Sequence, residues 1–397
     1  METVDSFRHF VQSCPHIDGH AHNLLKSNVA CELSSLSTAS EPSDDTLIHR
    51  NRPSLSSLRA FNNISELYGL SRCSPSEQQL NDTHKQLVRQ DYEGLIRTCL
   101  KGTHTLILDA SLPLDSEVDS EDQEPYNWHD QFTTSPTSRV LRIETMAESL
   151  LVDIMSENRV ANESVWSLFR RRFREALSTA IQDTSIVAFT TDICSRTGLD
   201  IDPHTAGDDI LTASLYRTLD LGTRSSGYYI EDKPLNEWLV QQTLNIPRAK
   251  PLQFHGGWSK EPSTVPNRLY SLPAPKPTPA LLEPLIANHS DGPKIVLSLA
   301  YPYARDAAYL ASYYRNVYLD LGEVFPRVSR EGQENFLREC LEVAPTTQLL
   351  WSSNGIWQPE SFWLANKQFR QALETVRLKA HGGSYMLLNN DSDIGSC

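Results

Sequence analysis

The sequence predicts an α/β protein of the (β/α)8 TIM-barrel class, in which eight parallel strands are surrounded by helices. Three observations support this fold class. Short runs rich in β-branched residues alternate eight times with longer amphipathic stretches, and the loops of the last third are short. No Gly-x-Gly-x-x-Gly turn follows the first predicted strand, which removes the commonest reason to prefer an open doubly wound sheet.

The composition fits a large globular core. The chain has 397 residues, of which 39% are hydrophobic and 22% charged, as in soluble proteins. Barrels of this class often exceed about 250 residues through insertions. No run of Pro and Gly divides the sequence, and we therefore predict a single domain over residues 1–397.

Charge and apolar content argue against nucleic-acid and membrane partners, and the cysteines bear on the location of the protein. The formal net charge is −14, which argues against nucleic acid as a partner, because such a surface needs clustered Lys and Arg. No apolar run approaches the roughly 18 residues that cross a bilayer, and no basic, apolar leader is present, so we expect no membrane association. The seven scattered cysteines include no Cys-x-x-Cys pair and fit reduced thiols, which predicts a cytoplasmic location.

In the first half of the chain, four strands are predicted from short apolar runs bounded by polar turns. The first is followed by a Ser-rich segment of low periodicity, residues 27–57, which predicts an inserted loop or helical excursion after strand one. An acidic loop follows the second strand. The predicted strands are Cys14–His22, Thr103–Asp109, Arg139–Glu144 and Ser185–Thr190, and the predicted helical regions are Leu55–Leu70, Thr83–Lys101 and Met146–Asp183.

The second half is more regular, because each apolar run is followed by an amphipathic stretch of helical length. Its polar end, residues 389–397, is expected to be frayed. The predicted strands are Pro251–His255, Lys294–Leu299, Val317–Leu321 and Gln348–Ser352, and helices are predicted between Ile210 and Leu244 and at Tyr303–Tyr314, Arg330–Val343 and Ser361–Ala380.

Three histidines stand where such a barrel places its chemistry, at the carboxyl ends of strands. His20 and His22 lie two apart in the first strand, so both side chains point to the same side. His255 ends the fifth strand. Three imidazoles at one mouth could hold Zn²⁺ or Mn²⁺. The alternative interpretation is hydrogen-bonded core histidines for the pair and a strand-end histidine for His255.

Several segments carry a more specific resemblance. They are Asp18–Asn23, Lys250–His255, Ala300–Tyr303 with Tyr309–Ala311, Tyr318–Glu323 and Pro359–Gln368. In these segments the sequence resembles the amidohydrolase superfamily, and within it the barrels that fungal FluG-type proteins carry fused to a glutamine synthetase domain. The resemblance extends from about Pro15 to Ala380. It implies an amidohydrolase-like barrel that acts on a small molecule.

The resemblance also implies a set of metal ligands, which this sequence matches only in part. The family places His-x-His on the first strand, often Lys on the fourth, His on the fifth, His on the sixth and Asp on the eighth. His20, His22 and His255 match this pattern. Thr190, Ser298 and Asn354 stand at the other three positions.

These departures bear on mechanism. An amide such as that of Asn354 is a poor metal ligand and cannot act as a general base, although it could orient water or a substrate carbonyl. Thr190 excludes a carboxylated lysine bridge between two metals. A divalent metal, Zn or Mn, therefore stays possible, and its binding could be weak or absent. Glu144 at the end of the third strand, or Glu323 after the seventh, could replace the base, unless they cap helices or face solvent.

Other side chains near the mouth are candidates for substrate binding. Arg196 and Arg305 follow the fourth and sixth strands and could bind a carboxylate. Trp258, Tyr301 and Trp357 could form an aromatic wall, or could belong to the core.

Three functions fit these residues. The first is an enzyme that acts on a small nitrogen-containing or carboxylated metabolite, through C–N bond chemistry in specialised metabolism. The second is a non-hydrolytic enzyme, an isomerase, decarboxylase or cyclase, on the same barrel. The third is a binding protein without catalysis. Each implies a small-molecule ligand, and a homo-oligomer is possible.

Overall fold

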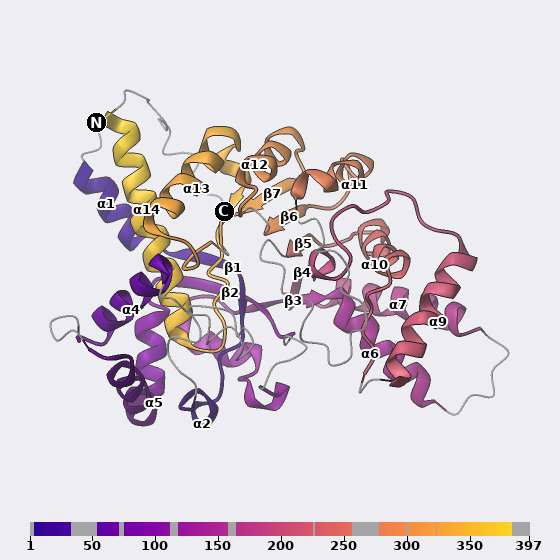
Figure 1. Ribbon diagram of the computed structural model, residues 1–397, viewed down its shortest axis with the longest axis horizontal. Coiled ribbons are helices and arrows are strands. Elements are labelled where there is room, and N and C mark those ends of the chain that lie inside the picture. The colour runs from indigo at the N-terminus through magenta and orange to yellow at the C-terminus, as the bar shows by residue number, and fades with distance from the viewer. Residues whose placement is uncertain are drawn as a thin grey trace.

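The computed structural model describes residues 4–32, 54–70, 75–111, 118–157, 164–224, 227–255, 278–298, 301–322 and 324–382. An eight-stranded sheet with the sequential strand order β1 to β8 lies at its centre, and all neighbouring strands are parallel (Figure 1). The strands are β1 (His16–His22), β2 (Thr103–Asp109), β3 (Ser138–Arg142), β4 (Ile186–Thr191), β5 (Leu252–His255), β6 (Ile295–Ser298), β7 (Val317–Asp320) and β8 (Leu349–Leu350). The predicted (β/α)8 barrel is confirmed.

Backbone hydrogen bonds join the first strand to the chain that follows the last strand. The Gly19 amide donates to the Trp351 carbonyl at 2.9 Å, and the His22 amide donates to the Gly355 carbonyl at 2.7 Å. Between them, the Asn354 amide donates to the His20 carbonyl at 3.0 Å. The barrel is therefore closed largely by irregular backbone after the two-residue strand β8, and this closure fixes Asn354 beside His20.

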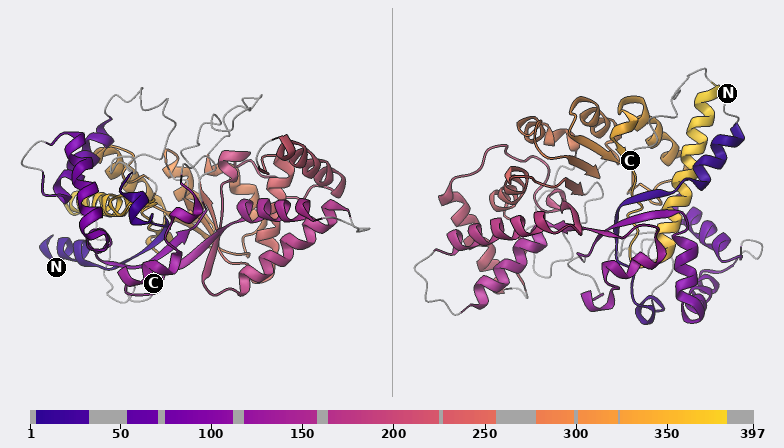
Figure 2. Two further views of the ribbon diagram at one scale, coloured as in Figure 1. Left: turned by 90° about the horizontal axis from the view of Figure 1, so that it is seen from below. Right: turned by 180° about the vertical axis from the view of Figure 1, so that it is seen from behind.

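Helices cover the outside of the sheet and fall into groups that the three ribbon views show (Figures 1 and 2). One group extends to one side of the barrel and contains α6, α7, α9 and α10; α12 and α13 lie beside one another along another side, and α4 and α5 lie with the long α14 near α1. The α-helices are α1 (Val4–Ser13), α2 (Ser27–Ala30), α4 (Leu55–Leu67), α5 (Glu77–Cys99), α6 (Ile143–Ser156), α7 (Val165–Gln182), α8 (Ile193–Arg196), α9 (Asp208–Arg224), α10 (Lys233–Asn245), α11 (Glu283–Asn288), α12 (Ala304–Tyr313), α13 (Arg330–Val343) and α14 (Pro359–Gly382). Short 3₁₀ helices lie at Ser120–Asp122, Tyr126–Phe132, Pro279–Leu282 and Thr346–Gln348.

Serine residues begin several of these helices, because a serine hydroxyl accepts from a backbone amide that lacks a helical partner. Ser54, Ser164 and Ser329 cap α4, α7 and α13 in this way. Ser76 and Gln79 form a complete capping box at the start of α5. These caps help to explain why each of these four helices begins directly after a serine.

Alternate residues of each strand pack outward or inward. Phe189, Phe254, Leu297 and Leu319 belong to the large core that the strands form with the surrounding helices. The intervening positions carry polar side chains at the carboxyl ends of the strands. The core thus holds the strands in a fixed register and leaves a polar layer inside the barrel mouth.

Some boundaries differ from the prediction. Glu144 does not end β3 but lies in the first turn of α6, and the helical region predicted at Met146–Asp183 consists of two helices, α6 and α7. α1 was not predicted. The segment predicted as an excursion, residues 27–57, begins with α2, and its residues 33–53 lie outside the described ranges, as does the tail 389–397.

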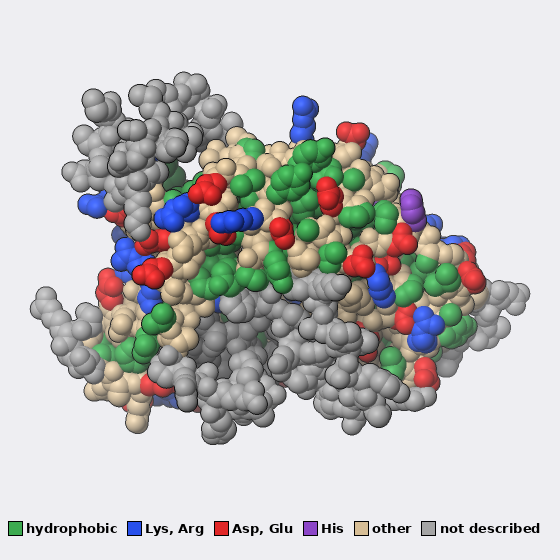
Figure 3. Space-filling model, turned by 45° about the horizontal axis from the view of Figure 1, so that its top comes forward, with side chains coloured by type: hydrophobic (Ala, Val, Ile, Leu, Met, Phe, Trp, Pro, Cys, Tyr) green, Lys and Arg blue, Asp and Glu red, His purple; other side chains and the backbone are tan. Residues whose placement is uncertain are grey.

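No helix in the described part of the chain is both long enough and apolar enough to span a bilayer. On the face drawn in Figure 3, acidic and basic side chains are interspersed among hydrophobic ones rather than gathered by sign.

Candidate active site at the barrel mouth

The strand register brings polar side chains into one layer inside the barrel. His22 pairs with Asp109, Arg142 with Thr190, and Thr190 in turn with Gln253. Paired residues of parallel strands point to the same side of the sheet. The Gln253 side chain reaches across the barrel to His20, so this side is the interior. His255 lies two residues after Gln253 and faces the same mouth.

His20 is held in one tautomer. Its Nδ1 lies 2.8 Å from the Gln253 Oε1, and the Gln253 amide group donates to the Gly19 carbonyl at 3.1 Å. That second bond orients the amide, so its oxygen accepts and Nδ1 of His20 carries the hydrogen. The Nε2 atom of His20 is then a lone-pair acceptor; it is buried and has no hydrogen-bond partner among the described residues.

His22 is held in the same tautomer by a different partner. Its Nδ1 lies 3.1 Å from the backbone carbonyl of Asp109, and a carbonyl only accepts, so Nδ1 donates. Burial lowers the pKa of His22 to about 4, which keeps the ring neutral. The lone pair of Nε2 is therefore available on both residues of the His-x-His pair.

The third predicted histidine lies close to the first. The ring centroids of His20 and His255 are 4.4 Å apart, and those of His20 and His22 are 5.5 Å apart. Burial of the ring lowers the pKa of His255 well below its usual range. The structure thus brings the three histidines together, although no three His, Cys, Asp or Glu side chains of the described ranges surround one point as metal ligands.

Thr190, Ser298 and Asn354, which stand where the resemblance implies other residues, lie at this end of the barrel. The Thr190 hydroxyl is fully buried and lacks a partner among the described residues. Asn354 adopts a left-handed backbone, with φ of 50°, and its side-chain oxygen is likewise without a partner in that part of the chain. The Ser298 hydroxyl donates to the carboxylate of Asp320 at 2.9 Å.

Asp320 is a mouth carboxylate that the sequence analysis did not select. It ends β7, and its Oδ2 accepts from the hydroxyls of Ser298 at 2.9 Å and Ser352 at 2.6 Å, while Oδ1 accepts from the Gly322 amide at 3.1 Å. Burial raises the pKa of Asp320, and the hydrogen bonds oppose this shift. The sequence alone placed Asp320 at a strand end. Its serine partners could not be predicted, because they come from β6 and from the segment after β8.

Asp18 is a second buried carboxylate that was missed. It lies two residues before His20 on β1 and accepts from the backbone amide of Ser353 at 2.8 Å and from the hydroxyl of the same residue. Burial raises the pKa of Asp18 to about 7. These bonds anchor the segment after β8 to β1 below the histidines.

Arg142 was missed as well. One of its terminal nitrogens lies 2.7 Å from a carboxylate oxygen of Asp109, and the other lies 3.6 Å from Asp192. The Nε atom has no partner among the described residues. The sequence analysis placed residue 142 in a strand but attached no role to it, because its neighbours on β2 and after β4 are distant in sequence.

Glu144 and Arg196 belong to a buried network beside the mouth. Glu144 accepts from the Thr191 hydroxyl, and burial together with the charge of Asp192 raises the pKa of Glu144 to about 8. Arg196 donates to Asp192 at 2.7 Å and to Glu148 at 2.5 Å, and its side chain is 2% exposed. Glu144 and Arg196 make these contacts within the network and not with the histidines.

The remaining candidates are spread more widely. Arg305 is on the surface of α12, with its side chain 75% exposed and 3.1 Å from Glu339 of α13. Tyr301 packs against the large core, and Trp357 is buried in the core beneath α5. Trp258 and Glu323 lie outside the described residues.

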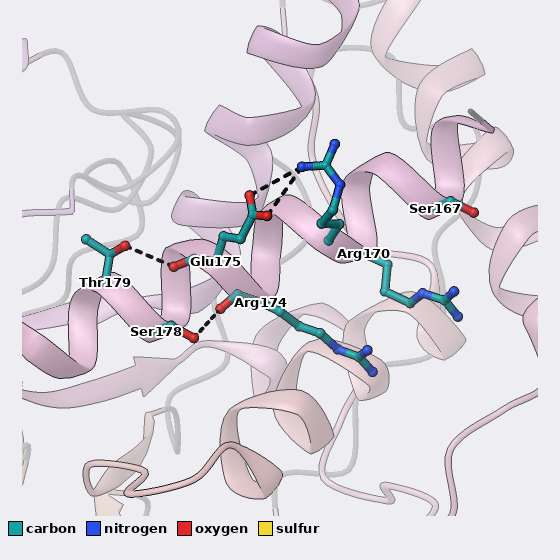
Figure 4. Close-up of a pocket in the computed structure, with 7 residues that line it drawn as sticks. Ser167, Arg170, Arg174, Glu175, Ser178 and Thr179 are labelled. Carbon is teal, nitrogen blue, oxygen red and sulfur yellow. Dashed lines mark hydrogen bonds and ion pairs between the residues drawn. The ribbon is translucent and has the colours of Figure 1, made fainter. Parts of the chain in front are cut away.

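A cavity of about 610 Å³ opens along the outer helix α7 and not at the mouth (Figure 4). Its arginines already have partners within the chain: Arg170 pairs with Asp208 at 2.9 Å, Arg171 with Glu175 at 3.3 Å, and Arg174 with Gln242 at 2.8 Å. The mouth, with its unpaired buried polar atoms, is therefore the stronger candidate site.

Comparison with known proteins supports the fold. No family model matches the chain. Protein fluG of Emericella nidulans is 43% identical over 396 residues, which cover 95% of this chain, and the chain spans 44% of that relative's length. This similarity agrees with the predicted resemblance to FluG-type barrels, while membership of the amidohydrolase superfamily stays a prediction.

Solved structures of enzyme-like barrels are similar at low identity. A candidate metal-dependent hydrolase from Lactobacillus casei is 20% identical, with a TM-score of 0.70 over 97% of this chain and 92% of that one. A uronate isomerase from Thermotoga maritima is 12% identical, with a TM-score of 0.62 over 96% of this chain and 92% of that one. At these identities the likeness shows a shared barrel fold.

Proposed function

We propose that this protein is an enzyme whose active site lies at the barrel mouth, where His20, His22 and His255 hold a divalent cation. We propose further that it acts on a C–N bond of a small carboxylated metabolite. The observation that carries the proposal is the fixed tautomer of His20 and His22. Each ring donates through Nδ1, so each leaves an Nε2 lone pair, and that of His20 is buried without a partner among the described residues.

The chemistry of these donors suits a cation such as Zn²⁺ or Mn²⁺, and the three side chains would have to converge further to hold it. Neutral imidazole is the form that binds these metals, and a ligating histidine usually donates its other ring nitrogen to a carbonyl or carboxylate. Gln253 and the Asp109 carbonyl occupy that supporting place here. When bound, the cation would polarise a carbonyl and lower the pKa of a coordinated water.

Asp320 is the proposed proton-transfer group. Asn354 cannot accept a proton from water near neutral pH. Asp320 ends the strand next to β8 and faces the interior at the level of Ser298, which pairs with His255 in the register. Glu144, the earlier candidate, contacts Thr191 at the edge of the mouth. Asp320 is therefore better placed than Glu144 to transfer a proton to or from a substrate bound at the histidines.

A non-hydrolytic reaction is the second candidate. The observation in its favour is that Asn354 and Ser298 stand at two positions where a hydrolytic site of the family would carry Asp and His. A site without those groups still has imidazoles and Asp320 for proton transfer within a substrate. Incubation in H₂¹⁸O separates the two candidates, since hydrolysis of an amide places one heavy oxygen in a new carboxylate of the product, and a non-hydrolytic reaction forms no such carboxylate.

The first experiment that tests the proposal measures the affinity of the protein for metal ions. The purified protein and the variants H20A and H22A are titrated with Zn²⁺ and Mn²⁺ against a chromophoric chelator. We expect one tight site in the wild type and loss of that site in both variants. H289A is a matched control, because His289 is also buried and bonded to a carbonyl, that of Leu285 at 2.9 Å, on α11. Equal affinity in wild type and H20A would refute the metal site.

Activity is then measured with the metal-loaded protein on a panel of N-acyl amino acids and related amides. We expect D320N to lose turnover while it keeps its metal, because the amide cannot transfer the proton. A D320N variant with unchanged turnover would remove Asp320 from the mechanism and leave the metal site standing.

A further inference from the structure

We propose that Arg142 and Thr190 form a subsite that binds the carboxylate of the substrate inside the barrel mouth. The inference rests on the proposed function only in placing the substrate at this mouth. Neither residue is one of the candidates selected from the sequence for substrate binding.

The two residues are neighbours on adjacent strands. Arg142 ends β3 and pairs with Thr190 of β4, so their Cα atoms are at the same level and their side chains share the interior side. Thr190 also pairs with Gln253, the residue that fixes the His20 ring. Asp109, which holds the Arg142 guanidinium at 2.7 Å, pairs with His22 in the register of β1 and β2, which places the guanidinium near that ring. A ligand held by this pair would therefore lie beside the histidines.

Both residues present an unused polar group. The Thr190 hydroxyl belongs to a residue that is 0% exposed, and it has no partner among the described residues. The Nε atom of Arg142 also lacks a partner in that part of the chain. Both groups can donate, and buried donors in folded proteins are normally satisfied. Two donors on neighbouring strands, both without an acceptor among the described residues, match an acceptor that a ligand would bring.

The rest of the guanidinium is already fixed. Asp109 holds one terminal nitrogen at 2.7 Å, and Asp192 lies 3.6 Å from the other. Asp192 is shared, because Arg196 binds it at 2.7 Å. Arg142 is thus oriented by one dedicated carboxylate and one shared carboxylate, and its Nε edge and part of its charge remain for a ligand.

A carboxylate fits this arrangement better than a phosphate. Its two oxygens are acceptors only, which matches two donors from two side chains. A phosphate carries more charge and more oxygens, and the acidic neighbours Asp109 and Asp192 would disfavour it more strongly at a site with a single free cationic edge.

The test compares two probes that differ in one group. N-acetylglycine carries a carboxylate, and N-acetylglycinamide carries a neutral amide in its place. Binding of each to the full-length protein is measured by isothermal titration calorimetry. We expect the wild type to prefer the acid at least tenfold, and T190V to lose about tenfold in affinity for the acid with little change for the amide, since hydrogen bonds to charged groups are the stronger class.

Matched variants keep the result interpretable. T218V makes the same change at another buried threonine, whose hydroxyl bonds the Ser214 carbonyl at 3.2 Å on α9, and should leave both affinities unchanged. R142K retains the charge and removes the Nε edge, and should weaken acid binding as T190V does. Equal affinity of the wild type for both probes, including no binding of either, overturns the subsite, as does undiminished acid binding in folded T190V and R142K.

The outcome is separable from that of the metal site. If H20A loses Zn²⁺ and T190V keeps its acid preference, the metal site stands and the subsite falls. If H20A binds Zn²⁺ as the wild type does and T190V loses its acid preference, the subsite stands and the metal site falls.

Discussion

Gln253 offers the sharpest test of how the barrel prepares its histidines. Replacing it with leucine removes the acceptor that holds the Nδ1 hydrogen of His20 at 2.8 Å and the donor to Gly19. His20 is 1% exposed, so its Nδ1 loses this partner in a place that water does not readily reach. Loss of such a supporting contact typically lowers metal affinity about 10- to 100-fold. At 1.36 kcal/mol for each factor of ten, that is about 1.4 to 2.7 kcal/mol of binding free energy.

The assay is competition for Zn²⁺ between the protein and a chromophoric chelator, with Q253L beside Q241L. Gln241 is also buried and bonds two carbonyls, those of Asp202 at 2.6 Å and His204 at 3.1 Å, but it lies on α10. Both variants should lose stability by about 1–3 kcal/mol, because each leaves buried polar groups unpaired. Only Q253L should lose metal affinity. Equal Zn²⁺ affinity in folded Q253L and the wild type would refute this reasoning.

Three further predictions concern the stability of the protein and the role of residue 354, which follows β8. E360Q should cost about 3–5 kcal/mol in free energy of unfolding, because it breaks the buried pair with His84 at 2.8 Å; urea unfolding measures this cost, and a loss below about 1 kcal/mol contradicts it. The pKa of His84 is raised by Glu360, against the effect of burial, and that of Glu360 is lowered, so the pair should stabilise fully between the ordinary values of 4.5 and 6.5. Its contribution should fade as pH rises through the raised His84 pKa or falls through the lowered Glu360 pKa, and a wild-type-minus-E360Q difference that is flat from pH 4 to 9 opposes this assignment. G322A should lower Tm, because its Cβ would lie 2.0 Å from the Ser352 hydroxyl and 2.6 Å from the Ser352 carbonyl, whereas G227A, with open space around it, should not. N354D should raise Zn²⁺ affinity by supplying a carboxylate beside His20, and unchanged affinity would show that residue 354 does not reach the cation.

Much of the barrel could be predicted because its strands and helices follow local patterns. The strand Thr103–Asp109 and the helix Arg330–Val343 have the predicted bounds. Glu144 was misplaced because its apolar run continues from β3 directly into α6. No capping side chain marks the junction at Arg142, so the sequence offers no stop signal there.

The histidines of the site could be predicted because each lies at the carboxyl end of a predicted strand, and a barrel brings these ends to one mouth. His20 and His22 were recognisable because a strand places residues two apart on the same side. The bond from Ser298 to Asp320 joins two strands, and the register of Arg142 with Thr190 depends on how β3 meets β4. A shift of one residue in that register would turn either side chain out of the mouth. Such partners follow from barrel closure, which local sequence does not encode.

Asn354 stands where the amidohydrolase resemblance implies a carboxylate, and the barrel closes at this residue through its backbone. The backbone amide of residue 354 makes the closing bond to His20, so the side chain is free to change. The left-handed backbone there, with φ of 50°, is one that Asn tolerates better than most residues. An Asn in place of the implied Asp would therefore alter the chemistry at the mouth and leave the closing hydrogen bond in place. Asp320 ends the neighbouring strand β7 and is already oriented by Ser298 and Ser352, and we propose that it carries the acid–base chemistry that an amide at position 354 cannot perform.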